Sequence, residues 1–147
     1  MNHSPLQLSR HFFTKVVVEA NPNGKPEISN QLNCHLEVGQ SAEDAKQWQV
    51  TVRLKLESPS EGEACYTGEI HAVGLFRVVD GWPDEKIPLL VEANGAALLY
   101  GAIREMLLNL TARGPWAPVL LNSMTFIKPK PNPQMLDSAT PSDEAKG

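Results

Sequence analysis

Hydrophobic and polar residues alternate along the first half of the chain in the period-two pattern of β-strands. The clearest run is 48–57, whose side chains on one side are all apolar: Trp48, Val50, Val52, Leu54 and Leu56. The segment 30–38 alternates in the same way, and 12–20 is apolar and rich in β-branched residues. A fourth strand-like run extends from 64 to 79. These segments predict a four-stranded sheet with one apolar and one polar face.

Turn residues separate the predicted strands. Residues 58–62, Ser-Pro-Ser-Glu-Gly, predict a tight turn and therefore a hairpin between the third and fourth strands, within an antiparallel meander. Gly68 and Gly74 interrupt the long fourth run, where a bulge or bend is expected. Asp-Gly-Trp-Pro at 80–83 ends the strand pattern, and a helical pattern follows. Strands first and a helix afterwards predict an α+β fold with the helix on the apolar face of the sheet.

Residues 94–113 have the spacing of a helix. An apolar stripe runs along it, widened on both sides by other apolar residues: Leu99, Ile103, Met106 and Leu110, flanked by Leu98, Ala102 and Leu107. Asn94 is expected to cap its start, and Arg113-Gly114-Pro115 to supply a cation, a left-handed cap and a stop. A helix that is apolar on more than one side is expected to pack on two sides.

The chain changes character after the helix. Residues 116–121 form an apolar loop, for which core filling and a binding surface both remain open. Alternate prolines at 128–133 cannot hold a helix, and 138–147 is small, polar and charged. We therefore expect a flexible N-terminus over 1–8, one domain over 9–128 and a disordered proline-rich tail over 129–147.

Composition excludes several classes of function. The chain has 147 residues, 41% of them hydrophobic, and a formal charge of -4, which suits one acidic domain with a substantial core. It has no basic stripe, so binding to nucleic acid is not expected. It also lacks a signal-peptide pattern and any unbroken apolar run of about 18 residues, so the sequence predicts a cytoplasmic protein without membrane insertion.

The residues that could carry chemistry are few. Cys34 and Cys65 are the two cysteines, and they predict either one disulfide or, in a reducing compartment, two buried thiols. His35 and His71 lie on predicted strands without a third ligand at useful spacing, so neither a metal nor a cofactor is expected. Cys65, Glu69 and His71 share a strand face, but a flat sheet supplies neither an oxyanion site nor a closed pocket. The sequence predicts that the protein is not an enzyme.

Several short motifs occur in one order along the chain. They are Phe13-Thr14-Lys15, Glu19-Ala20-Asn21-Pro22, Glu69-Ile70, Gly74-Leu75-Phe76, Leu98-Leu99-Tyr100, Arg104-Glu105, Arg113-Gly114 and Phe126. In this order and spacing, over roughly residues 8–126, they resemble the SecB family of export chaperones. Two positions depart from the family pattern, because Val16 replaces an aspartate and Thr67 replaces a leucine. The family's tryptophan before the second strand is missing, and its second helix is expected to be short or absent here.

The resemblance implies a four-stranded antiparallel sheet with a long helix on one face, assembled as a homotetramer of two dimers. Members of the family hold unfolded polypeptides in the cytoplasm without ATP. Export members pass precursor proteins to the SecA motor through an acidic outer sheet face and a C-terminal tail. The two departures in this chain put docking to SecA in question.

Site residues follow from the resemblance position by position. The predicted client-binding residues lie on the second strand and on the loop after the helix: Leu32, Cys34, Leu36, Trp116, Val119, Leu120 and Leu121. Glu19 and Glu69 match acidic positions of the SecA-facing surface. The predicted interface between dimers comprises Leu99, Ile103, Met106 and Leu110, some of which must instead pack on the sheet. For each strand residue, simple core filling is the alternative.

Three functions follow from the sequence. The first is a SecB-like holding chaperone for precursors in protein export and translocation, or, alternatively, one dedicated to a single client such as an antitoxin. The second is a scaffold or adaptor of the same fold that binds one folded partner. The third is a small enzyme that uses the face of Cys65, Glu69 and His71.

Overall fold

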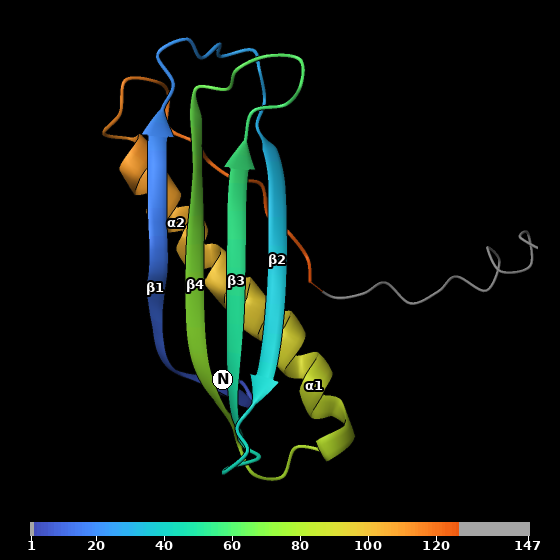
Figure 1. Ribbon diagram of the computed structural model, residues 1–147. Coiled ribbons are helices and arrows are strands. Elements are labelled where there is room, and N and C mark those ends of the chain that lie inside the picture. Colours follow the sequence, from blue (N-terminus) through green and yellow to red (C-terminus); the bar gives the residue numbers. More distant parts are fainter. Residues whose placement is uncertain (1, 127–147) are drawn as a thin grey trace, which may run out of the picture.

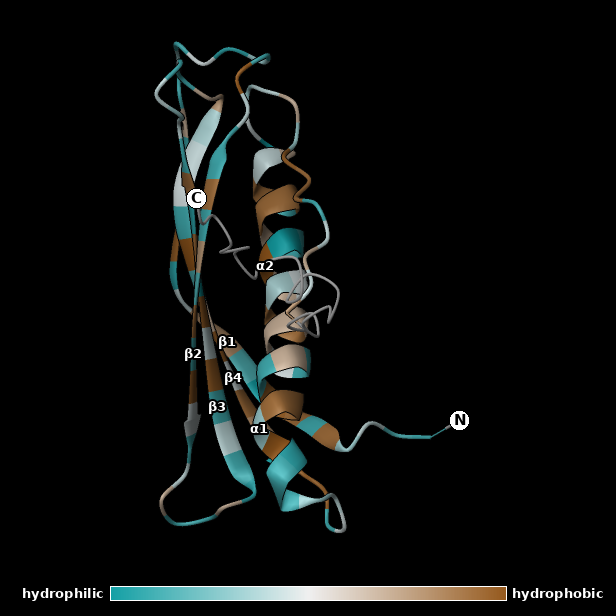
Figure 2. Ribbon diagram, turned by 90° about the vertical axis from the view of Figure 1, so that its right-hand side faces the viewer, coloured by the Kyte–Doolittle hydropathy of each residue, from teal (hydrophilic) through white to brown (hydrophobic). Residues whose placement is uncertain are grey.

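The computed structural model describes residues 2–126, and these residues form a sheet covered on one face by a helix (Figures 1 and 2). The strands are β1 (Leu6–Ala20), β2 (Gln31–Gln40), β3 (Gln47–Glu57) and β4 (Tyr66–Val78), and all neighbouring pairs are antiparallel. The α+β fold class, with a four-stranded antiparallel sheet and a long helix on one face, is confirmed. The predicted tail and the expected short or absent second helix lie outside the described residues.

The strand order is β1-β4-β3-β2, so β1 lies beside β4 and not beside β2. The hairpin of β3 and β4 is present as predicted, but a simple meander through all four strands is wrong. The link over 21–30 explains the difference, because it pairs with the turn between β3 and β4 at the end of the sheet. Asn21 N–H donates to the Cys65 carbonyl at 2.8 Å, and Lys25 N–H to the Glu63 carbonyl at 2.9 Å. The link therefore carries the chain across the sheet end before β2 begins.

The register irregularities of the sheet lie on β1, between Leu8 and Arg10 and between Phe13 and Lys15. β4 runs against β3 without interruption, so the bulges expected at its glycines are absent there. Gly68 is needed for another reason. A Cβ atom at this position would overlap the Val17 carbonyl on the neighbouring strand. The glycine lets β1 approach β4 closely.

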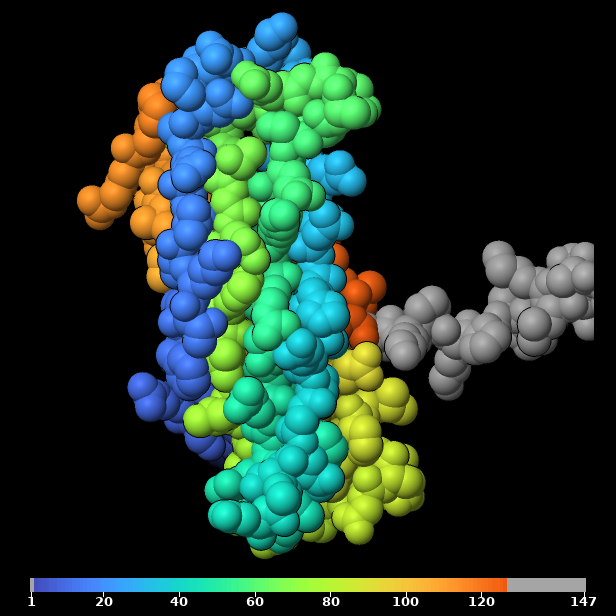
Figure 3. All heavy atoms as spheres, viewed as in Figure 1, coloured from blue at the N-terminus to red at the C-terminus, as the bar shows by residue number. Residues whose placement is uncertain are grey.

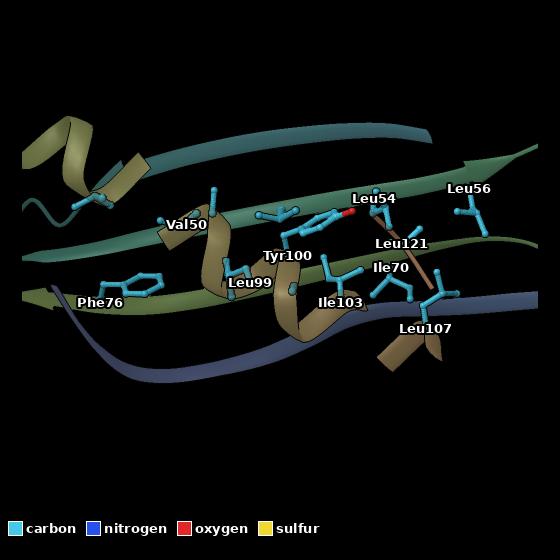
Figure 4. Close-up of a cluster of buried hydrophobic side chains, with 14 of the residues drawn as sticks. Val50, Leu54, Leu56, Ile70, Phe76, Leu99, Tyr100, Ile103, Leu107 and Leu121 are labelled. Atoms are coloured by element: carbon cyan, nitrogen blue, oxygen red, sulfur yellow. The ribbon is translucent and has the colours of Figure 1, made fainter. Parts of the chain in front are cut away.

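The core lies between the helix and the apolar face of the sheet (Figure 4). Alternate residues of β3 and β4 point into it, as the period-two pattern predicts, and they meet one face of the helix. Its members include Val50, Val52, Leu54, Leu56, Ile70, Phe76, Leu99, Ile103 and Leu107. Each such side chain contributes about 1.5–3 kcal/mol of burial free energy. This packing fixes which face of the helix is turned away from the sheet.

The helical region begins earlier than the sequence pattern predicts. It comprises a 3-10 turn, η1 (Asp84–Lys86), then α1 (Ile87–Leu90), a π-helical turn, η2 (Val91–Gly95), and α2 (Ala96–Thr111). Asn94 therefore lies inside the helical region, and the prediction that it caps the start is wrong. The segment begins directly after Pro83, and Pro88 occupies the first turn of α1, where its missing N–H costs nothing.

Gly114 follows the end of α2 but does not adopt the left-handed conformation expected of a helix cap. Among the described residues Gly81 is the glycine with a positive φ, at 89°. Gly114 is small for a packing reason, because a Cβ atom there would overlap the Tyr66 hydroxyl. The predicted helix stop is correct, since α2 ends at Thr111, but its mechanism is different.

Candidate functional site

The residues after α2 form an extended segment, 115–126, which we call the strap. Its start reaches the end of β1, where the Trp116 indole N–H donates to the Asn21 carbonyl at 3.0 Å. The strap then returns along the helix, so that Leu121 enters the core at 6% exposure. Its last described residue, Phe126, packs edge-on against Tyr100 with ring centres 5.9 Å apart. The strap is the orange segment behind the sheet in Figure 1.

Two buried hydroxyl groups, those of Tyr66 and Thr111, hold the first half of the strap. The Tyr66 hydroxyl accepts the Trp116 N–H at 3.0 Å and lies 3.2 Å from the Thr111 carbonyl. The Thr111 hydroxyl donates to the Leu107 carbonyl at 2.7 Å and accepts the Val119 N–H at 2.8 Å. We call Tyr66, Thr111 and Trp116 the latch. Because buried polar groups are costly when unpaired, this arrangement fixes where the strap leaves the helix.

Tyr100 holds the second half of the strap. Its hydroxyl donates to the Asn122 carbonyl at 2.6 Å, and nearby the Arg104 guanidinium donates to the Ser123 hydroxyl at 3.3 Å. Burial raises the pKa of Tyr100, and the Cys34 thiol on β2 raises this pKa further. Tyr100 therefore connects the helix, the strap and the surroundings of β2.

The predicted client-binding residues of β2 lie on the helix side of the sheet. Leu32, Cys34 and Leu36 are paired with Leu56, Leu54 and Val52 of β3, whose side chains are in the core. Leu32 is 39% exposed, whereas Cys34 and Leu36 are half-buried against the core. Burial raises the pKa of the Cys34 thiol. These side chains form an apolar margin beside the core.

The strap residues that were predicted to bind clients differ in exposure. Trp116 and Val119 are half-buried, Leu120 is 67% exposed and Leu121 is buried. The structure therefore places the strand and strap sets on the same side of the sheet, with Leu121 filling space in the core. The sequence pattern did not predict a site role for Tyr66, Thr111 or Tyr100. The chain contains two tyrosines, and both belong to this site. Their scarcity in the sequence was the signal that could have pointed to them.

The helix residues predicted to join dimers separate into two groups. Leu99 and Ile103 face the sheet, are almost fully buried and leave no surface for another subunit, so the interface prediction is corrected for these two. Leu110 is exposed and Met106 is partly buried. Met106 packs against the core, whereas Leu98, at 50% exposure, does not contribute to it.

The outer face of the sheet, which Figure 3 shows from the side opposite the helix, carries charged side chains of both signs that pair with one another. Basic groups from all four strands lie in one cross-strand row: Lys15, His71, Arg53 and His35. Glu69 lies 2.9 Å from Lys15 and 2.6 Å from His71, and Glu37 lies 2.7 Å from Arg53. Hydrogen bonds from Lys15 and then His71 lower the pKa of Glu69. The other predicted acidic position, Glu19, is exposed on the same face.

Arg53 stands between the two histidines that were considered as a metal pair, since His35 and His71 are its partners on either side. No group of metal-ligating side chains occurs in the part of the chain that the structure describes. Cys65 packs against the core, whereas Glu69 and His71 bond to each other on the outer face. Cys34 and Cys65 are both free thiols.

Acid is expected to weaken the ion pairs of the outer face. Hydrogen bonds from Arg53, Lys55 and Lys15 lower the pKa values of Glu37, Glu57 and Glu69 in the folded chain. Their stabilisation is therefore complete above the ordinary glutamate pKa of about 4.3 and is lost as the pH falls through the lower folded values. We expect the melting temperature to decrease when the pH is lowered below about 5.

The measurement is a series of thermal unfolding curves from neutral to acidic pH on the wild type and on Glu69→Gln. The difference between the two proteins should be largest near neutral pH and should vanish at the acidic end. A difference independent of pH would show that the Glu69 charge does not stabilise the fold.

Comparisons with known proteins agree on one family. A family model described as preprotein translocase subunit SecB matches residues 6–128. The protein-export protein SecB of Bradyrhizobium diazoefficiens is 24% identical over 120 residues, which cover 78% of this chain and 74% of the relative. That of Saccharophagus degradans is 27% identical over 103 residues, covering 70% of this chain and 59% of the relative.

A solved structure shares the fold. It is a SecB-like chaperone of Mycobacterium tuberculosis in complex with a ChAD peptide from the HigA1 antitoxin, with a TM-score of 0.61 and 17% identity. The similarity covers 82% of this chain and 88% of that one. Within the described residues, no helix is long and apolar enough to cross a membrane.

Proposed function

The chain belongs to the SecB family, and on this premise we propose that it is a chaperone that holds unfolded polypeptides without ATP and keeps them from aggregating. One observation carries the proposal: the helix side of the sheet leaves large apolar side chains accessible beside the core. Leu32 and Val38 of β2 and Leu120 and Met124 of the strap are all exposed. An accessible apolar margin of this kind suits the apolar side chains of an unfolded chain.

Holding requires binding energy and no other source of energy. A chaperone that binds only the unfolded form lowers the concentration of free, aggregation-prone chains by mass action. The sequence contains no phosphate-binding loop in which a glycine-rich turn precedes lysine and a hydroxyl residue, which supports action without ATP. The curated relatives are named protein-export proteins, and we propose that the clients are precursor proteins for export, held in the cytoplasm.

The outward side of α2 supports assembly into a tetramer of two dimers. It presents an apolar stripe in which Leu98 and Leu110 are exposed, Ala102 is partly buried and Met106 packs partly against the core. A single chain leaves this stripe accessible, and a second helix packed on it would bury it. We propose that the domain assembles through these residues.

The charges of the outer face favour a second candidate, a SecB-like chaperone dedicated to one client such as an antitoxin. Docking to SecA is expected to need an acidic face, whereas here the carboxylates of Glu37, Glu57 and Glu69 are bonded to neighbouring cations. The solved structure that shares this fold holds an antitoxin peptide. A dedicated chaperone needs no motor-docking surface.

A light-scattering assay tests the proposal. A chemically unfolded, unrelated protein is diluted with and without this protein, in the absence of nucleotide, and the mass of the complex is determined. Suppressed aggregation together with a stable complex is the expected result for a general export chaperone. If several unrelated proteins aggregate unaffected at several-fold excess, general holding is contradicted, and binding of one specific partner would then distinguish a dedicated chaperone from a scaffold.

A further inference from the structure

The second half of the strap, residues 121–126, lies where the proposed function places a client. Leu121 is buried beside Leu54 (Figure 4). Phe126 covers the Tyr100 ring at 5.9 Å between ring centres. The apolar space between the helix and the β2 side of the sheet is therefore filled by the chain itself. This inference rests on the proposed function and concerns the same site.

The strap resembles an unfolded polypeptide in how it is bound. Of the residues that the structure describes, 117–123 form no hydrogen bond between backbone groups, and they belong to no helix or strand. The sequence from Val119 to Phe126 contains no charged residue. The contacts are an aliphatic side chain in the core, an aromatic ring on Tyr100 and a backbone carbonyl on the Tyr100 hydroxyl. Any extended apolar segment can offer the same three contacts.

The two halves of the strap are held differently. The latch bonds the first half through buried hydroxyl groups at 2.8–3.0 Å. In the second half, Met124 points its apolar side chain to solvent, and Asn122 and Ser123 are exposed. Release of 121–126 would leave the latch bonded, so the strap can open at one end while it stays anchored at the other.

We propose that residues 121–126 are the resident occupant of the client groove, and that an unfolded segment binds by displacing them while Tyr66 and Thr111 keep the first half of the strap in place. Since only the open form binds, the apparent dissociation constant for a client is the intrinsic constant divided by the open fraction. A substitution that weakens the resident contact raises this fraction and therefore tightens client binding. If the strap were instead a wall of the client groove, weakening its contacts would weaken client binding.

Phe126→Ala tests whether weakening the resident contact tightens or weakens client binding. It removes the ring that covers Tyr100 but leaves the latch and Leu121 unchanged. The probe is a permanently unfolded, reduced and alkylated protein carrying a fluorophore, titrated with wild type and variant to obtain Kd. We expect the Kd to fall by about fivefold in Phe126→Ala. In the matched control, Leu89→Ala, a 65% exposed apolar side chain of α1 outside the strap is shortened, and the Kd should stay unchanged.

A second arm does not depend on an external client. A labelled peptide with the sequence of residues 117–126 is titrated in trans against both proteins and should bind Phe126→Ala more tightly than the wild type. Weaker or unchanged binding of the peptide by Phe126→Ala, with an unchanged melting temperature, overturns the inference. If the unfolded protein binds neither chain while the peptide shows the expected preference, the proposed chaperone function fails and the assignment of the strap stands.

Discussion

Ile103→Ala is expected to lower the free energy of unfolding by about 3 kcal/mol. Ile103 is 0% exposed and lies on the sheet side of α2 among Leu54, Ile70 and Leu107 (Figure 4). Truncation removes buried methyl groups and leaves a cavity that the close-packed sheet and helix cannot fill. Urea unfolding followed by circular dichroism measures the loss as a lower midpoint with an unchanged slope.

Leu98→Ala is the matched control for this change, since it shortens an aliphatic residue of the same helix at a position that is 50% exposed in the single chain. Under dilute conditions that favour the single chain, its effect should stay within about 0.5 kcal/mol. An equal loss of unfolding free energy in both variants would contradict the assignment of Ile103 to the core and Leu98 to the surface. The sheet would then pack on both sides of α2.

Both faces of α2 are apolar, and this is why the sequence could not separate them. Leu99, Ile103 and Met106, which pack in or against the core, and Leu110, which is exposed, belong to one helical stripe. Burial in a core and burial against another subunit select the same residue types. The periodicity predicted a helix with too much apolar surface for one contact, and only the position of the sheet divides that surface.

Short-range patterns were predicted well because they depend on local geometry. The alternation over 48–57 matches the apolar side of β3, where Val50, Val52, Leu54 and Leu56 are buried, although Thr51 on the polar side is buried as well. The pairing of β1 with β4 was not predicted, because it depends on the path of the link over 21–30 around the end of the sheet. Strand order is set by contacts between distant residues, and a periodic pattern contains no information about them.

The latch likewise depends on contacts between distant residues, which the sequence pattern could not predict. The apolar loop after the helix was predicted, and so was the involvement of Trp116. The bonds that position it come from Tyr66 on β4 and Thr111 at the end of α2. Each of these residues fits its own element without any sign of a polar role. Their function is visible only when the strap brings its amide groups to their hydroxyls.

Met106→Glu and Leu98→Glu are expected to dissociate the proposed tetramer into dimers. Leu98 is 50% exposed and lies outside the core, and Met106 is partly buried at the margin of the core; the proposed contact between dimers would remove both from water. A carboxylate buried at that contact would lack a partner, and its desolvation would cost several kcal/mol. In the single chain the same carboxylate at position 98 can remain in solvent. Light scattering coupled to size exclusion should therefore show half the wild-type mass for Leu98→Glu.

Leu120→Glu supplies the control for introducing a charge, because Leu120 is 67% exposed on the strap and lies off the helix stripe. Its mass should equal that of the wild type, while its suppression of aggregation should fall, since a carboxylate would stand in the apolar margin of the client site. If Leu98→Glu keeps the full mass and an unchanged melting temperature, the outward side of α2 is not the contact between dimers. The apolar stripe would then be accessible in the assembled protein, and the client surface would extend from the strap across the helix.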